Sequence, residues 1–305
     1  MPPTPIAYWI AFHLALLLLL AVERTYARRQ LRLGRDPQHR ALVTTALWVT
    51  AAFALAVFLH HSFGPAASAQ YLAGYAIEES LSIDNLFVFL LLFRLFQIDA
   101  LRQPRVLFWG VAGAILLRGI FIAGGLTLLA PFAWFSYAFA LLLLIAAVRL
   151  LLPSAKNEPL AAPRWLAWLT RLQPISPRQD CFVVRENGRS MATVLLLALL
   201  AIELCDVVFA LDSIPAVLSI TRNAFLAYTS NIMAVMGLRS LYFLLIGALS
   251  RLRFLHYGLS AVLAFAASRI LLSRWIEIGP MVSLAVILTL LAITLGTSLL
   301  APASE

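Results

Sequence analysis

Six acidic residues lie inside two strongly apolar segments of this chain, where carboxylates are costly. They are Glu78, Glu79 and Asp84 in residues 71–93, and Glu203, Asp206 and Asp212 in residues 192–219. An aspartate at the centre of a membrane-spanning helix costs roughly 2.5–3.5 kcal/mol. Two basic residues, Arg118 and Arg239, lie in comparable apolar segments and can balance two of the acids. The surplus predicts neutralisation by protons, by a bound cation, or by each in turn; the alternative is a salt-bridge network whose remaining acids stay protonated.

The spacing of the acids constrains how they could meet. Glu203 and Asp206 are three residues apart and share one helix face, whereas Asp212 points opposite Glu203 on an unbroken helix. These helices are therefore either surrounded by protein or interrupted, so that the second acid turns back toward the first. Pro215 predicts an interruption in 192–219, because its missing N–H would leave the Leu211 carbonyl unpaired. A milder break is expected in 71–93.

The other donors near these acids are hard oxygen atoms, which suit Mg²⁺, Mn²⁺ or Ca²⁺ rather than Zn²⁺ or Cu⁺. Met233 and Met236 could give Mn²⁺ a softer contact, or could simply fill space. Arg118 and Arg239 could occupy the site when it is empty, or could stabilise packing; both interpretations stay open. The oxygen donors are the amides of Asn85 and Asn231 and the hydroxyls of Ser213, Thr229 and Ser230.

The elements that would position these residues are transmembrane helices. The chain has 305 residues, is 62% hydrophobic and only 12% charged, more apolar than a soluble domain of this length could bury. About nine apolar runs are long enough to cross a bilayer, and the first reads as a retained helix rather than a cleaved signal peptide. The predicted fold is an all-α membrane protein with one transmembrane domain over residues 1–305. The runs are 6–22, 41–60, 71–93, 106–129, 132–152, 192–219, 225–249, 255–273 and 279–300.

The net charge of +9 reports topology rather than nucleic-acid binding. Eighteen of the 23 basic residues fall in alternate loops, on one side of the predicted bundle. By the positive-inside rule the N-terminus lies outside and the C-terminus in the cytoplasm, as in a multi-pass protein of the cytoplasmic (inner) membrane.

The sequence also contains an inverted repeat. Both halves show an acid pair, then an arginine in the pattern Leu-Arg-x-aliphatic-aromatic (117–121 and 238–242), then a Tyr-to-Arg segment (136–152 and 256–272). Two helices, 6–60, precede repeat 1 (71–152), and one helix, 279–300, follows repeat 2 (192–273). Three helices per repeat force opposite orientations, an arrangement that places substrate sites near mid-membrane and suits alternating access.

A polar stretch, 153–191, separates the repeats. Residues 162–174 predict a short helix on the membrane surface, and 180–190 predict a hairpin turning at Asn187-Gly188. Two cysteines, Cys181 and Cys205, form no disulfide framework or thiolate cluster.

Four stretches resemble the TerC family of integral membrane proteins, in particular its TerC/Alx branch: 74–93, 105–125, 202–221 and 228–245. The resemblance runs from about residue 40 to 300. It implies relatives among LysE-type transporters with inverted three-helix repeats, a link to tellurium-resistance operons, and manganese export. It places the family's acidic motifs on Glu78, Asp84, Glu203, Asp206 and Asp212, with Asn85 and Ser213 alongside. Departures are Glu79 and Arg269 where lysine is common, and Asn223-Ala224 in place of Asp-Pro.

These observations predict a transporter that exports Mn²⁺, with Mg²⁺ or Ca²⁺ as alternative cargo, and proton coupling as one option. Its site would lie between two interrupted helices, with Glu203 as ligand or proton carrier and Glu79 and Asn231 as secondary candidates. The alternative is a TerC-type membrane assembly factor or scaffold without transport activity. No nucleophile–base pair or nucleotide loop indicates an enzyme, and the sequence leaves the oligomeric state open.

Overall fold

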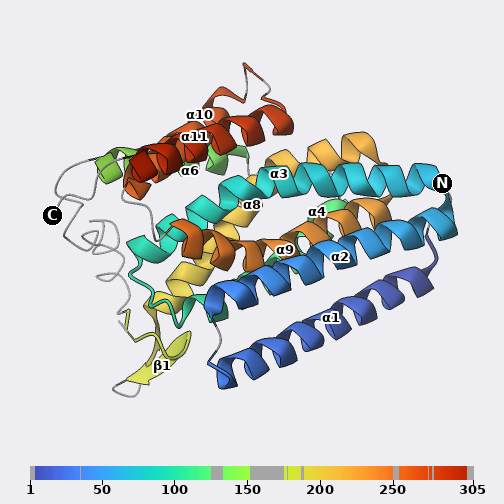
Figure 1. Ribbon diagram of the computed structural model, residues 1–305, viewed down its shortest axis with the longest axis horizontal. Helices are drawn as coiled ribbons and strands as arrows, with labels where there is room; N and C mark the ends of the chain where they lie inside the picture. The colour runs from blue at the N-terminus through green and yellow to red at the C-terminus, as the bar shows by residue number, and fades with distance from the viewer. Residues whose placement is uncertain are drawn as a thin grey trace. The chain divides into compact units, whose positions relative to one another are not determined.

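Nine helices and one hairpin make up the described part of the chain (Figure 1). This computed structural model describes residues 4–34, 36–124, 133–151, 175–176, 178–186, 189–249, 254–273, 275–276 and 278–300. The helices are α1 (Ile6–Arg32), α2 (Pro37–Phe63), α3 (Pro65–Leu95), α4 (Gln103–Gly124), α6 (Ala133–Leu151), α8 (Val194–Ile220), α9 (Ala224–Leu249), α10 (Leu255–Leu272) and α11 (Pro280–Leu300). The strands are β1 (Val183–Glu186) and β2 (Arg189–Ala192).

The all-α membrane fold is confirmed. Within the described residues, six helices are long and apolar enough to cross a bilayer: α1, α2, α4, α8, α9 and α11. Helices α6 and α10 contain shorter apolar stretches, and α3, which carries Glu78, Glu79 and Asp84, is not one of the six. Nine spans, the inverted repeat, the single domain and the orientation of the termini stay predictions.

The chain forms two compact units, and α3, α4 and α8 contribute residues to both. Unit 1 contains Met1–Ser82, Arg118–Leu129 and Asp212–Arg251; within it α2 packs along α9 and α1 joins α2 (Figure 1). Unit 2 contains Ile83–Leu117, Ala130–Leu211 and Leu252–Glu305; within it α10 packs against α6 and α11. The Ser260 hydroxyl of α10 donates to the Ala147 carbonyl of α6 at 2.7 Å, which joins two helices that the predicted repeat makes equivalent.

Local sequence explains where α2 begins and ends. The Asp36 carboxylate accepts from the Gln38 N–H at 3.1 Å, and Pro37 occupies the first helical position, where its missing N–H does no harm. Gly64 follows the helix with φ of 89°, a conformation that glycine adopts without strain, and Pro65 opens α3. The chain therefore turns from α2 into α3 within one residue.

The predicted interruption of the two acidic helices is wrong. Helix α8 continues through Pro215 to Ile220, and α3 is one helix over 31 residues. A proline within a helix removes one backbone hydrogen bond, which the neighbouring turns can tolerate. The other possibility, helices surrounded by protein, holds for α3: every side chain from Leu86 to Phe93 is buried. Of the described acids on α3, Glu78 is buried and Glu79 is partly buried.

The polar stretch between the repeats forms the predicted hairpin. Strands β1 and β2 pair antiparallel, with Glu186 opposite Arg189, so two residues connect them. The segment before β1 is held to the α3–α4 connection of unit 2: Gln179 accepts from the Asp99 N–H at 2.9 Å and donates to the Gln97 carbonyl at 3.0 Å. The predicted surface helix, 162–174, lies outside the described residues.

Candidate functional site

A buried polar cluster in unit 1 contains the first acid of the predicted site. Glu78 of α3 is 1% exposed, and Arg118 of α4 and Asn231 of α9 are fully buried. The Arg118 guanidinium contacts Glu78 Oε1 and Asn231 Oδ1, and Asn231 Nδ2 donates to Glu78 Oε2 at 3.0 Å. The Ser82 hydroxyl, one turn along α3, donates to Glu78 Oε1 at 3.4 Å. Three helices are thus joined through one carboxylate.

This cluster gives Arg118 a defined partner. The ion pair with Glu78 fits the interpretation of Arg118 as a counter-charge, and a cation that used Glu78 as a ligand would have to displace the guanidinium. Packing stability remains the other interpretation, because a buried ion pair can also specify how helices meet. The metal-ligand role of Glu78 stays a prediction.

A glycine allows the helices of this cluster to approach closely. A Cβ atom on Gly74 of α3 would lie 2.8 Å from Ser230 Oγ of α9 and 3.4 Å from a methyl group of Val217 in α8. A side chain there would displace the Ser230 hydroxyl or shift α9. Ser230 is the residue before Asn231. The close approach of α9 to Gly74 therefore affects how near the Asn231 amide lies to Glu78.

Two further candidates in unit 1 present buried oxygens. Glu79 lies against Gly237 of α9, where a Cβ atom would be 4.0 Å from both carboxylate oxygens. Glu79 Oε2 and Ser213 Oγ are buried and have no hydrogen-bond partner among the described residues.

Unit 2 holds the candidates on the first part of α8. A Cβ atom on Gly113 of α4 would collide with the Glu203 carboxylate, so Glu203 lies directly against that glycine. Asp206 is 5% exposed. Glu203 Oε2 and the Asn85 Oδ1 of α3 are buried without a hydrogen-bond partner among the residues described. Gly110, about one turn earlier on α4, likewise lies against Ile202 of α8, so these two glycines leave room for α8 side chains.

Asp84 and Asp212 are the two remaining acids of the predicted site. The backbones of Asp84 and Asp212 belong to α3 and α8, but their side chains lie outside the described part of the structure. Among the residues that are described, no three His, Cys, Asp or Glu side chains gather as a metal-binding group. The predicted ligand set therefore stays a prediction.

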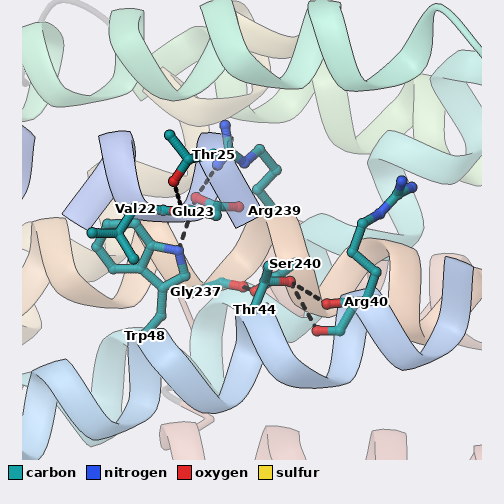
Figure 2. Close-up of polar contacts among 10 residues, drawn as sticks. Val22, Glu23, Thr25, Arg40, Thr44, Trp48, Gly237, Arg239 and Ser240 are labelled. Atoms are coloured by element: carbon teal, nitrogen blue, oxygen red, sulfur yellow. Dashed lines mark hydrogen bonds and ion pairs between the residues drawn. The ribbon is translucent and has the colours of Figure 1, made fainter. Parts of the chain in front are cut away.

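Arg239 pairs with an acid that the sequence interpretation missed. Its guanidinium contacts Oε2 of Glu23 in α1, and Trp48 Nε1 of α2 donates to the same oxygen at 3.2 Å (Figure 2). The first apolar run was predicted to end at residue 22, but α1 continues to Arg32, so Glu23 is a buried helical residue rather than a loop residue. The sequence signal was its position directly after the apolar run and one residue before Arg24.

Comparison with known proteins agrees with this membrane architecture. Residues 63–305 match the family model described as "Integral membrane protein TerC family". The chain is 39% identical over 303 residues to an uncharacterized membrane protein of Myxococcus xanthus, covering 97% of this chain and 94% of that protein. It is 35% identical over 297 residues to a protein of Photorhabdus laumondii named "Putative membrane-bound redox modulator Alx", covering 94% and 92%. The protein of the same name from Escherichia coli K12 is 42% identical over 229 residues, covering 73% and 70%. No solved structure matches the chain significantly.

Proposed function

Because the chain belongs to the TerC family of integral membrane proteins, we propose that it is a transporter that exports Mn²⁺ from the cytoplasm. The predicted ligands of the cargo are acidic and amide side chains carried by α3 and α8. The N-terminus would lie outside and the C-terminus in the cytoplasm, in the cytoplasmic membrane, as the distribution of basic residues indicates.

One observation carries the proposal: four buried oxygens of candidate residues have no hydrogen-bond partner among the described residues. They are Glu79 Oε2, Asn85 Oδ1, Glu203 Oε2 and Ser213 Oγ. Buried polar atoms in native proteins are almost always satisfied, so each such atom calls for an explanation. Carboxylate, amide and hydroxyl oxygens are the donors that a hard divalent cation uses, and all four stand on the two helices that carry the acids.

The ion pair between Arg118 and Glu78 suggests how binding and release could alternate. With no cation bound, the guanidinium and the Asn231 amide satisfy both oxygens of Glu78. A divalent cation carries twice the charge of arginine and can displace it; the returning guanidinium then favours release. In this scheme Arg118 prevents the carboxylate from being buried without a partner, a state that is strongly destabilising.

Flux measurement with purified protein tests the proposal directly. Proteoliposomes loaded with a metal-sensitive dye should show protein-dependent entry of Mn²⁺ exceeding that of Mg²⁺ and Ca²⁺. A pH dye inside the same vesicles reports whether protons move in the opposite direction. If proteoliposomes that contain folded protein take up Mn²⁺ no faster than protein-free vesicles, the proposed transport function is refuted.

A second candidate is a membrane assembly factor or modulator without transport. The name of the Photorhabdus and E. coli relatives, a putative membrane-bound redox modulator, favours this class. In this chain a redox role would involve Cys181 or Cys205, both of which are free thiols. A Cys181→Ser/Cys205→Ser variant that keeps full manganese tolerance in cells favours transport, whereas loss of function with no metal flux favours the modulator.

A further inference from the structure

We infer that Glu23 is a positioning residue for the candidate site. By holding Arg239, it fixes the position of α9 and so keeps the Asn231 amide on Glu78. The consequence for transport rests on the proposed function, whereas the effect on α9 does not.

Glu23 connects three helices through one carboxylate oxygen. Oε2 accepts from Arg239 of α9 and from the indole N–H of Trp48 in α2, as Figure 2 shows. Glu23 is 7% exposed, and Trp48 is 1% exposed. The neighbouring hydroxyls do not join this cluster in their described contacts: Thr25 donates to Val22 O, and Ser240 to Gly237 O, each within its own helix.

Among the described residues, the contact is one of three side-chain polar contacts that link the α1 and α9 segments, in the same order along both segments. The Asn223 amide, just before α9, donates to the Thr4 hydroxyl, just before α1, at 3.3 Å. Farther along, His13 Nε2 and the Tyr228 hydroxyl lie 3.0 Å apart. His13 Nδ1 lies 2.8 Å from the Trp9 carbonyl and must donate to it, because a carbonyl oxygen can only accept. Glu23–Arg239 is the third contact and the one ion pair of the set.

These contacts lie on both sides of Asn231 along α9. Tyr228 lies one turn before it, and its ring packs against Gly119, the residue after Arg118. Arg239 follows eight residues after Asn231, which in a helix means a rise of about 12 Å and a rotation of about 80°. A helix held at both points cannot slide or rotate without moving the Asn231 amide off Glu78.

The chemistry of the pair favours positioning over stability. Replacing a buried ion pair by apolar residues is often neutral or stabilising, whereas removing one partner is strongly destabilising. The best-attested use of such pairs is to specify register between helices. A second donor from Trp48 adds directional constraint to the same oxygen, because an indole N–H bonds only along one line.

The test compares Glu23→Gln with Thr25→Val, a control on the same turn of α1, and Arg239→Gln with Ser240→Ala on α9. Amide hydrogen exchange of residues 224–236 is measured in detergent without metal. Glu23→Gln and Arg239→Gln should each speed exchange there at least tenfold, while the two controls match wild type. Unchanged exchange in Glu23→Gln overturns the inference.

The same variants are then assayed for Mn²⁺ flux in proteoliposomes. Glu23→Gln should raise the half-saturating concentration at least fivefold while changing the maximal rate less than twofold. If a single variant does not fold, Glu23→Leu/Arg239→Leu replaces it, and this pair should insert normally yet show the same fast exchange and weak affinity. Wild-type affinity in that pair overturns the inference. If the wild-type protein transports no Mn²⁺, the proposed function fails, and the exchange measurement still decides the role of Glu23.

Discussion

Removing the Arg118 side chain should tighten cation binding while slowing transport. In the structure Arg118 is fully buried, and its guanidinium engages Glu78 and Asn231. In the scheme proposed above, a cation must displace this guanidinium, so the affinity measured for wild type includes the cost of breaking the pair. Arg118→Met removes the charge and its donors while keeping a long, flexible side chain.

The size of the effect follows from the contact that is lost. A hydrogen bond to a charged group contributes about 1.5–3 kcal/mol, and 1.4 kcal/mol corresponds to a factor of ten in affinity. Arg118→Met should therefore bind Mn²⁺ roughly 10- to 100-fold more tightly. Transport should fall because the group that favours release is missing.

Two measurements check this prediction. Calorimetry gives the dissociation constant, and proteoliposome flux gives the maximal rate. Arg269→Met is the matched control, since Arg269 is also buried and donates to the Ser283 hydroxyl at 3.1 Å. Unchanged or weaker binding in Arg118→Met, with folded protein and flux like wild type, would refute the exchange of guanidinium and cation.

Three shorter predictions concern neighbouring contacts. Gly113→Ala should lower flux at least tenfold because its Cβ collides with the Glu203 carboxylate; Gly296→Ala, with no atom nearby, should not change flux. Asp212→Asn should leave cells as sensitive to manganese as a deletion strain, and wild-type tolerance would contradict a ligand role. Trp48→Phe should lower the free energy of unfolding by about 1.5–3 kcal/mol, the contribution of one hydrogen bond to a charged group, read by thermal denaturation; no shift would mean that Glu23 gains nothing from the indole.

Helix positions follow from the sequence because each apolar run is long enough to form a helix of several turns. The nine apolar runs correspond to α1–α4, α6 and α8–α11, and the predicted hairpin is present as the paired strands β1 and β2. The end of α1 was missed by ten residues, because polar residues after an apolar run can extend a helix when a partner satisfies them. Glu23 is such a residue.

The partners of buried charges could not be derived from spacing within one helix. The sequence indicated that Glu78 and Arg118 matter, but their contact depends on where α3 and α4 meet, and Asn231 enters from a helix 113 residues farther along. The predicted break at Pro215 failed for a related reason. The sequence shows that Pro215 removes one backbone hydrogen bond from α8. It does not show whether the helix continues past that point, because this depends on the packing of the surrounding protein.

The partner of Arg239 also changes the charge balance on which the sequence interpretation depended. That balance set two arginines against the six acids of α3 and α8, but Glu23 uses the charge of Arg239, and Glu78 uses that of Arg118. Counting Glu23 with those six gives seven acids against the same two arginines, whatever other contacts the two guanidiniums make. The negative surplus is therefore one charge larger than the sequence suggested. Because isolated carboxylates are not tolerated in a low-dielectric interior, the need for protons or a cation becomes stronger.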